Sequence, residues 1–250
     1  MPTLLSPNDK KFTLTEKIDE TPEVEVVRFR SADGQRLQFY PGMFIMIYGI
    51  DTATGKPALA KAFSIASIPD SDMLELFIVK QPGHTATTAG HVSYFYQASV
   101  GQDFYIRGEP QGQFRFDPRV NKKVLFLAGG TGLAPFMSML RFIKEKDFDC
   151  DVALLYSIKF PTEVIRKQEL SDLAASLKLK TTISVTRPQP NDGWKGETGH
   201  IDAGKIKRIA PDFMERSVYV CGPLAFVTAM RDALKALNVP AENIKVDVWG

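Results

Sequence analysis

The strongest chemical signal in the sequence is a glycine-rich stretch between a predicted strand and a predicted helix. Residues 129–132 (Gly-Gly-Thr-Gly) follow the apolar run 124–128 and precede residues 134–146, which have helical periodicity. Glycines let backbone N–H groups approach a phosphate closely, and a helix N-terminus favours its negative charge. The motif departs from Gly-x-Gly-x-x-Gly because Pro135 stands at the third glycine. A tight turn without a ligand is the alternative to a nucleotide-phosphate site, for which the predicted residues are Gly130, Thr131 and Gly132.

Two further motifs lie in the first half of the chain. Residues 61–64 (Lys-Ala-Phe-Ser) place a cation, an aromatic ring and a hydroxyl on one segment. In a strand, alternation would put the cation and the ring on one face and the hydroxyl on the other, which alone is an ordinary strand. Residues 90–93 open a short helical run, 94–98, and form a second candidate anion site. Two phosphate turns, one in each half, suggest two nucleotides that meet where the halves join.

The first half has the pattern of short strands, which would position the motif at residues 61–64. Apolar residues alternate or run together at 24–30, 43–48 and 74–78, and turn residues separate these segments. Asp33 and Gly34 supply the positive φ angles of a tight hairpin after the first segment. We therefore predict an antiparallel barrel or sandwich for this half.

The second half alternates strands with helices. Strands are predicted at 124–128, 152–157, 181–186, 218–221 and 244–248, and helices at 134–146, 163–177 and 223–237. This order implies right-handed crossovers and a parallel sheet. The predicted architecture is β + α/β, with an N-terminal antiparallel β-barrel, residues 1–117, and a C-terminal parallel-sheet α/β domain, residues 118–250. The irregular stretch 187–200 is predicted to be a mobile loop.

Composition excludes several classes of protein. The 31 basic and 29 acidic residues give a net charge of +2, too small for binding to nucleic acid or an anionic membrane through charge. Two cysteines are too few for a Cys-ligated iron–sulfur cluster, and three scattered histidines lack zinc spacing. The longest uncharged run, 124–140, is interrupted by glycines and a proline. We expect no metal, no nucleic acid, no membrane span and, without an apolar N-terminal signal, a cytoplasmic location.

Taken in order, the motifs resemble those of the ferredoxin–NADP reductase family, which joins a flavin-binding antiparallel barrel to a nicotinamide-nucleotide-binding α/β domain. Residues 61–64 are similar to the family's Arg-x-Tyr-Ser, 90–93 to its Gly-x-x-Ser turn, and 130–135 to its Gly-Thr-Gly-Ile-Ala-Pro. Residues 221–223 match its Cys-Gly-Pro, and 246–249 resemble the C-terminal Val-Glu-Val-Tyr of plant-type members. The resemblance covers nearly the whole chain.

The resemblance implies FAD in the barrel half. Lys61 would face the flavin pyrophosphate, Phe63 would pack beside the ribityl chain, and Ser64 would hydrogen-bond flavin N5, which receives the hydride. Lysine lacks the bidentate fork of arginine and phenylalanine lacks a hydroxyl, so weaker flavin binding than is usual in the family is expected. The other implied flavin contacts are Ile78, Val79, Lys80, Gly90, His91, Val92 and Ser93.

The resemblance also implies a coenzyme site at the end of the strand that contains Cys221. The Cys221 thiol would lie beside the nicotinamide and Asp247 near the reacting ring, so Ser64, Cys221 and Asp247 are the implied catalytic residues. Trp249 would stack on the flavin until the nicotinamide displaces it, although Gly250 departs from the plant-type ending. Gly222 and Pro223 would complete the coenzyme contacts.

The end of the second parallel strand indicates which coenzyme binds. An acidic residue there would select NAD through the ribose hydroxyls. The sequence has none at this point: Ser157 and Lys159 end the strand, and Arg187 follows the next one. One hydroxyl and two cations suit a 2′-phosphate, so the sequence favours NADP, with NAD possible.

These expectations combine into an FAD-dependent NAD(P)H oxidoreductase that passes electrons to a separate protein acceptor, such as ferredoxin, flavodoxin or an oxygenase component. Basic clusters at 10–11, 122–123, 166–167 and 205–208 could receive an acidic carrier or be ordinary solvated surface. Three alternatives remain: an NAD(P)H flavin reductase that uses diffusible flavin, a non-catalytic electron-transfer subunit, and a nucleotide-binding module without a redox role.

Overall fold

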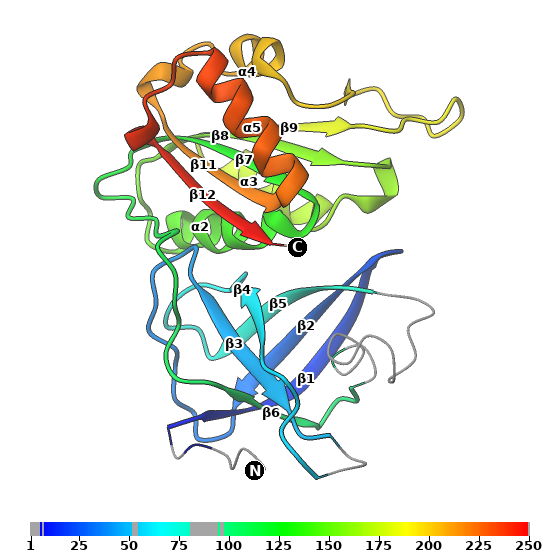
Figure 1. Ribbon diagram of the computed structural model, residues 1–250, viewed down its shortest axis with the longest axis vertical. Helices are drawn as coiled ribbons and strands as arrows, with labels where there is room; N and C mark the ends of the chain where they lie inside the picture. Colours follow the sequence, from blue (N-terminus) through cyan, green and yellow to red (C-terminus); the bar gives the residue numbers. More distant parts are fainter. Residues whose placement is uncertain (1–5, 7, 52–54, 81–94, 96–97, 250) are drawn as a thin grey trace. The chain divides into compact units, whose positions relative to one another are not determined.

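The computed structural model describes residues 6, 8–51, 55–80, 95 and 98–249 (Figure 1). The chain divides into two compact units, Met1–Arg115 and Phe116–Gly250. Within the described ranges, no helix has the length and apolar character that crossing a membrane requires.

The first unit is a six-stranded antiparallel sheet. Its strands lie in the order β4-β3-β6-β1-β2-β5. The chain after β4 returns to β5, where the Ala66 N–H donates to the Glu75 carbonyl at 2.9 Å, and this contact brings the two edges of the sheet together. The strands are β1 (Lys10–Thr21), β2 (Val24–Ser31), β3 (Phe44–Gly49), β4 (Lys61–Ser64), β5 (Met73–Val79) and β6 (Asp103–Ile106).

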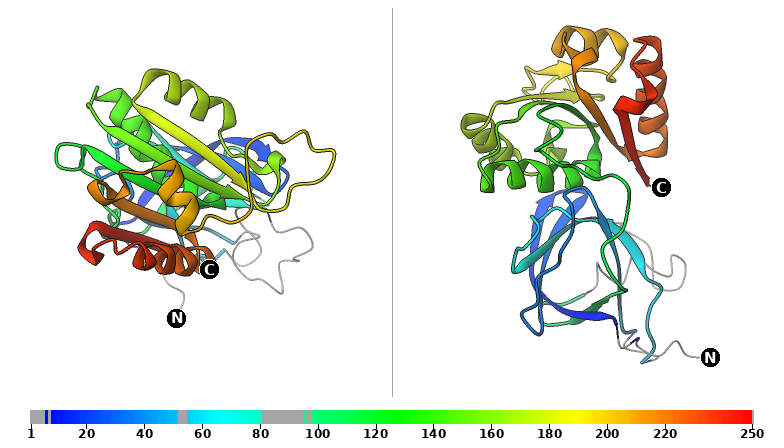
Figure 2. Two further views of the ribbon diagram at one scale, coloured as in Figure 1. Left: turned by 90° about the horizontal axis from the view of Figure 1, so that it is seen from above. Right: turned by 90° about the vertical axis from the view of Figure 1, so that its left-hand side faces the viewer.

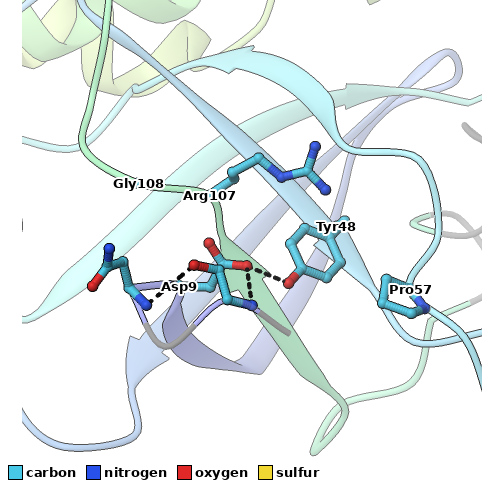
Figure 3. A pocket seen from close by; sticks show the side chains of 7 residues that line it. Asp9, Tyr48, Pro57, Arg107 and Gly108 are labelled. Carbon is cyan, nitrogen blue, oxygen red and sulfur yellow. Dashed lines mark hydrogen bonds between the residues drawn. The ribbon is translucent and has the colours of Figure 1, made fainter. Parts of the chain in front are cut away.

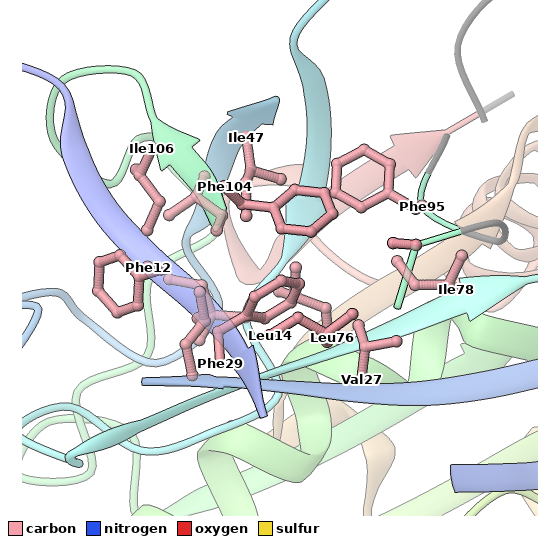
Figure 4. Packing of buried hydrophobic residues seen from close by; sticks show 14 of the residues in the cluster. Phe12, Leu14, Val27, Phe29, Ile47, Leu76, Ile78, Phe95, Phe104 and Ile106 are labelled. Carbon is pink, nitrogen blue, oxygen red and sulfur yellow. The ribbon is translucent and has the colours of Figure 1, made fainter. Parts of the chain in front are cut away.

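The core of this unit is made by the inward-facing residues of its strands (Figure 4). Leu14, Ile47 and Leu76 are completely or almost completely buried, and each such side chain contributes about 1.5 to 3 kcal/mol on burial. The Phe104 ring lies between two others, edge-on to Phe29 at 5.2 Å and stacked on Phe95 at 5.0 Å. The predicted antiparallel barrel is confirmed by this architecture.

The predicted hairpin at Asp33 and Gly34 is wrong. Gly34 has the expected positive φ, +74°, and the Asp33 carboxylate accepts the Gln35 N–H at 3.0 Å. The chain that follows forms no strand beside β2, however, because β2 pairs with β1 and β5. Turn chemistry predicts a change of direction, and it does not predict which strand lies next in the sheet.

The second unit is a parallel sheet with helices on both faces (Figure 2). The strand order is β10-β9-β8-β7-β11-β12. The strands are β7 (Lys123–Gly129), β8 (Asp151–Ile158), β9 (Leu179–Val185), β10 (Glu197–Thr198), β11 (Ser217–Pro223) and β12 (Ile244–Trp249). The helices are α2 (Ala134–Glu145), α3 (Lys167–Ser176), α4 (Ala203–Ile209) and α5 (Leu224–Ala236). This arrangement confirms the predicted α/β half.

Two apolar layers hold the helices to the sheet. On one face the Phe126 ring of β7 stacks on Phe136 of α2 at 4.7 Å and meets Tyr219 of β11 edge-on at 5.7 Å. On the other face α4 and α5 bury Ile206 and Leu234 against the strands. Helices cover both faces of the sheet. The end of the sheet that is formed by the carboxyl ends of the strands, called the carboxyl edge below, is therefore the place where a ligand can bind.

Helix α3 is shorter than predicted. The expected helix began at residue 163, whereas Pro161–Glu163 form a separate 3-10 turn, η2, and Arg166 has a φ of +52° before α3 begins at Lys167. Helical periodicity continues through this segment in the sequence, but a left-handed residue interrupts the backbone. Helix α4 was not predicted.

The stretch 187–200, predicted as a mobile loop, has a fixed base. The Trp194 indole N–H donates to the Glu197 carbonyl at 2.8 Å. From α4, the Lys205 ammonium donates to the Thr198 carbonyl at 2.7 Å, and Arg208 binds the Glu197 carboxylate with both of its terminal nitrogens. These contacts position the short strand β10 beside β9.

Candidate functional site

The glycine-rich turn lies at the carboxyl end of β7. Gly130–Leu133 form a 3-10 turn, η1, which leads directly into α2. Neither η1 nor α2 has a side-chain cap or an acidic residue in its first turn. Gly130 has a φ of +55°, and no atom lies within 4 Å of the position its Cβ would take. An uncapped helix N-terminus beside open space is suited to an anion.

The turn touches the end of β11, about 90 residues later in the chain. A Cβ on Gly132 would lie 2.3 Å from the Cys221 carbonyl oxygen, so only glycine allows this approach of two backbones. Cys221 in turn pairs with Ala128 of β7 and Asp247 of β12. The structure therefore brings together the predicted phosphate turn and two of the predicted catalytic residues, Cys221 and Asp247.

The Cys221 thiol is buried beside a carboxylate. Its Sγ lies 3.8 Å from Asp247 Oδ2, and no part of Cys221 is exposed. Burial raises the pKa of the Cys221 thiol well above its usual value, and the negative charge of Asp247 raises this pKa further. The thiol is consequently protonated at neutral pH and donates to the carboxylate, which makes it a polar neighbour and not a nucleophile.

The remaining residues of this edge follow from the pairing of β11 with β12. Gly222 lies opposite Val248, and Pro223 opposite Trp249. Trp249 is 38% exposed at the carboxyl end of β12, so its indole is accessible to a planar ligand.

The predicted coenzyme-selecting residues lie at the ends of β8 and β9, but not all in one group. The Arg187 N–H donates to the Lys159 carbonyl at 2.9 Å, so these two residues are neighbours, and both are exposed. Ser157 is buried within the sheet, opposite Gly129 and Ser184. Two of the three residues can therefore face a ligand together.

Sequence reasoning missed an acidic side chain at this point. Glu163, in η2, folds back so that its Oε2 accepts the N–H groups of Lys159 at 3.1 Å and Phe160 at 3.4 Å. A carboxylate does therefore lie at the end of the second strand, contrary to the expectation from residues 157–159. Its signal in the sequence is an acid that follows Pro161 in a short turn, and that pattern does not show where the side chain points.

In the first unit, residues 61–64 form β4, as the motif requires. Phe63 lies opposite Ile45 of β3, is partly buried on the barrel core, and meets the Phe95 ring edge-on at 5.1 Å. Lys61 lies opposite Ile47, and among the described residues no carboxylate pairs with its ammonium. Ser64 ends the strand, opposite Phe44.

The predicted flavin contacts at Ile78, Val79 and Lys80 lie at the end of β5. Ile78 is fully buried in the barrel core, and Val79 lies opposite Val24 of β2. The Lys80 ammonium binds the Asp19 carboxylate at 2.6 Å, and its N–H donates to the Glu23 carbonyl. Lys80 is thus engaged by its own chain, through both its side chain and its amide. The predicted phosphate turn of Gly90, His91, Val92 and Ser93 lies outside the described residues.

The barrel also carries a hollow of about 320 Å³ that the sequence did not indicate (Figure 3). Tyr48 donates its hydroxyl hydrogen to Asp9 at 2.6 Å, and the Arg107 guanidinium lies over the Tyr48 ring at 5.2 Å. Among the predicted flavin residues that the structure describes, none lines it. The lining residues are Ser6, Asn8, Asp9, Tyr48, Pro57, Arg107 and Gly108.

Most of the predicted basic clusters are neutralised within the chain. Lys10 binds Glu109 at 2.7 Å, Lys123 binds both Asp212 and Glu215, and Arg208 binds Glu197. These side chains do not form a free cationic surface. In the part of the chain that the structure describes, no three His, Cys, Asp or Glu side chains gather in a way that could hold a metal ion.

Comparison with known proteins extends this picture. Residues 126–232 match the family model described as the oxidoreductase NAD-binding domain. The chain is 29% identical over 238 residues to the glycine betaine monooxygenase reductase subunit of Pseudomonas aeruginosa, covering 93% of this chain and 62% of that protein. It is 28% identical over 250 residues to the ferredoxin reductase component of 3-ketosteroid-9-alpha-monooxygenase of Mycobacterium tuberculosis, covering 96% and 65%. The chain thus spans less than two thirds of the length of these relatives.

Solved structures share the fold. The flavohem-like FAD/NAD-binding domain of nitric oxide dioxygenase from Vibrio cholerae matches with a TM-score of 0.83 at 20% identity, over 97% of this chain and 99% of that one. The ferredoxin reductase in carbazole 1,9a-dioxygenase matches with a TM-score of 0.79 at 23% identity, over 97% and 69%.

An antiparallel barrel followed by a parallel-sheet NAD-binding domain, with a glycine-rich turn beside a Cys-Gly-Pro strand end, defines a class of two-domain oxidoreductases. Residues 126–232 match the oxidoreductase NAD-binding domain of that class, and the proteins to which the whole chain is similar include a monooxygenase reductase subunit, a ferredoxin reductase component and an FAD/NAD-binding domain. The resemblance seen in the sequence is confirmed.

Proposed function

We propose that this chain takes a hydride from NAD(P)H onto bound FAD and passes the electrons to a separate protein acceptor. The observation that carries the proposal is the carboxyl edge of the parallel sheet. There, the uncapped turn that begins at Gly130 directly follows β7, and the buried Cys221 thiol and the Asp247 carboxylate lie on the adjacent strands β11 and β12. The family and its reductase-subunit relatives support the same activity.

The residues of this edge fit a nicotinamide dinucleotide. Backbone N–H groups of Gly130, Thr131 and Gly132 would hold the pyrophosphate, because no acid in the first turn opposes its charge. Cys221 and Asp247 would orient the nicotinamide, and the thiol keeps its proton while it does so. When bound, the nicotinamide supplies the hydride from C4.

The residues of β4 fit a flavin. Lys61 offers a cation that no described carboxylate neutralises, which suits a pyrophosphate. Ser64 offers a hydroxyl at the end of the strand, and Phe63 offers an apolar edge. When bound, FAD accepts the hydride and releases electrons one at a time. The protein's part is orientation and the exclusion of water.

An oxygenase component is the acceptor that the relatives support best. Two of them are named as a reductase subunit and a ferredoxin reductase component of monooxygenases. Docking of an acidic carrier on the basic clusters has less support, because Lys10, Lys123 and Arg208 are already paired.

The test is rapid anaerobic mixing of the FAD-loaded protein with NADPH or NADH while the flavin absorbance is followed. Bleaching by at least one coenzyme is expected. A bound flavin that neither coenzyme bleaches, together with no NADP⁺ or NAD⁺ binding by titration, would indicate the non-catalytic subunit instead.

A flavin reductase is the second candidate, because Lys61 and Phe63 replace the arginine and tyrosine that usually bind flavin in this family. Gel filtration separates the two proposals. Flavin that stays with the protein supports a resident FAD, whereas flavin that elutes separately, combined with rapid turnover of added flavin, supports the reductase with diffusible flavin.

A further inference from the structure

Two glycines lie at the carboxyl ends of the neighbouring strands β7 and β11, and one aromatic ring fills the space that their missing side chains leave. Gly129 ends β7, and Gly222 lies near the end of β11. A Cβ on Gly222 would be 3.2 Å from the Gly129 Cα, so the two bare positions are adjacent. The ring of Phe226, from the first turn of α5, lies over both.

The ring excludes any side chain at either position. A Cβ on Gly129 would lie 2.8 Å from both Cγ and Cδ1 of Phe226, and a Cβ on Gly222 would lie 2.8 Å from Cδ1. Separations this short do not occur between real Cβ atoms and their neighbours. Backbone conformation does not impose glycine here, because Gly129 has an ordinary extended φ of −120° and Gly222 has no positive φ.

The position of the ring follows from the alternation of the two strands. Leu127 and Val220 point into the layer beneath α4 and α5, and Gly129 and Gly222 are the next positions on that same face. Phe226 is partly buried against this layer. The ring therefore takes the place of the two side chains that the strand ends lack.

Gly132 provides a contrast within the same turn. A Cβ on Gly132 would lie 2.3 Å from the Cys221 carbonyl oxygen, so the backbone of β11, and not the Phe226 ring, requires glycine at this position. A substitution at Gly132 should therefore be insensitive to what occupies position 226.

We propose that Phe226 is a positioning residue for the nicotinamide coenzyme. By packing on Gly129 and Gly222 it sets the spacing between the phosphate turn that begins at Gly130 and the segment that carries Cys221. The same packing explains why positions 129 and 222 are glycine. The inference rests on the proposed function, since it places the coenzyme at this edge.

The experiment is a double-mutant cycle on the full chain, read as the dissociation constant for NADP⁺ or NAD⁺ by titration. Gly129→Ala should weaken binding about tenfold or more, because the methyl group displaces the ring and the turn with it. Phe226→Ala alone should weaken binding less. The double variant Gly129→Ala/Phe226→Ala should bind like Phe226→Ala, because the methyl group then has space.

Three controls separate positioning from general loss of stability. Gly132→Ala should weaken binding in either background. Phe213→Ala removes a ring of the same apolar layer beneath the amino end of the sheet and should leave coenzyme binding unchanged. Phe226→Leu should restore most of the affinity lost in Phe226→Ala. At saturating coenzyme, the rate of flavin reduction should change little in Phe226→Ala while the KM rises.

The outcomes distinguish the inference from the function on which it rests. If the wild-type chain binds neither coenzyme, the proposed function fails. If it binds one but Gly129→Ala is not rescued by Phe226→Ala, the role of Phe226 is wrong. Should Gly129→Ala fail to fold alone, recovery of a folded, coenzyme-binding protein in the double variant supports the inference, and failure to recover overturns it.

Discussion

The Cys221 thiol and the Asp247 carboxylate are the side chains of the site whose chemistry depends most on burial. The thiol is protonated because burial raises its pKa, and it donates to Asp247. Cys221→Ala should slow flavin reduction at saturating coenzyme by up to about a hundredfold through misplacement of the reacting ring. Cys221→Ser, which keeps a donor, should retain most of the rate.

Rapid mixing measures both variants, and Cys150→Ala is the matched control. Cys150 is also buried, at 2% exposure, but it directly precedes β8 and so lies at the amino end of that strand, away from the carboxyl edge of the sheet. An equal loss of rate in Cys150→Ala and Cys221→Ala would show that the effect is one of stability.

Glu163 is the residue with the largest expected effect on the choice of coenzyme. Its carboxylate accepts the Lys159 N–H, and with the coenzyme bound as proposed it would favour ribose hydroxyls and oppose a 2′-phosphate. Glu163→Gln keeps an acceptor for the two N–H groups and removes the charge. The ratio of kcat/KM for NADPH to kcat/KM for NADH should rise roughly fivefold, which corresponds to about 1 kcal/mol.

Steady-state rates with both coenzymes check this, with the exposed Glu145→Gln at the end of α2 as the control. A ratio that does not move in Glu163→Gln would remove this residue from coenzyme selection. The sequence could not indicate this role, because periodicity predicts where the strand ends, at residue 157, but not which side chains of the next turn fold back towards that end.

At the scale of elements, Arg216 joins three strands of the parallel sheet at their amino ends. Its side chain is 7% exposed, donates to the Val124 and Asp151 carbonyls, and binds the Asp212 carboxylate with two nitrogens. Arg216→Met removes these hydrogen bonds, leaves Asp212 with Lys123 as its remaining cation, and should lower the free energy of unfolding by about 3 kcal/mol.

Denaturant unfolding measures this change. Arg119→Met serves as the control, because Arg119 pairs with Asp117 while 69% exposed, and the loss of such a surface pair should cost less than about 1 kcal/mol. Equal effects in the two variants would contradict a structural role for the Arg216 contacts.

The same contacts predict a pH dependence. The hydrogen bonds from Arg216, followed by those from Lys123, lower the pKa of Asp212 below its usual value of 3.8. A carboxylate with a lowered pKa in the folded state stabilises the protein above the unfolded-state pKa, and this contribution disappears as the pH falls through the folded-state value. The stability difference between wild type and Asp212→Asn should therefore be full above about pH 5 and shrink below about pH 4.

The elements that the sequence predicted well are those with uninterrupted periodicity. The strands near Val124, Val152 and Val218 and helices α2 and α5 appear within a few residues of their expected bounds. Strand β1 was missed because register shifts after Leu14 and Asp19 break its alternation, and β6 because four residues are too few for a pattern. Phe226 was missed because its role depends on packing between two strands and a helix.

At the scale of the whole molecule, each unit has its own sheet and its own core. The described strands of each unit pair only with strands of the same unit. The cluster around Leu14 belongs to the first unit and the cluster around Leu127 to the second. The Phe116 ring packs on Phe126 and Tyr219, so the second unit is anchored from its first residue. Each unit therefore has the contacts that an independent folding domain requires.

This independence predicts that a fragment of residues 116–250 folds and binds coenzyme without the barrel. Gly130, Cys221, Asp247 and Phe226 all belong to this unit, so the dissociation constant for NADP⁺ or NAD⁺ should stay within about tenfold of that of the full chain. Titration and cooperative thermal unfolding measure the two properties. Gly132→Ala should weaken coenzyme binding in the fragment as it does in the full chain. A folded wild-type fragment that binds no coenzyme would mean that the barrel supplies an essential part of the coenzyme site.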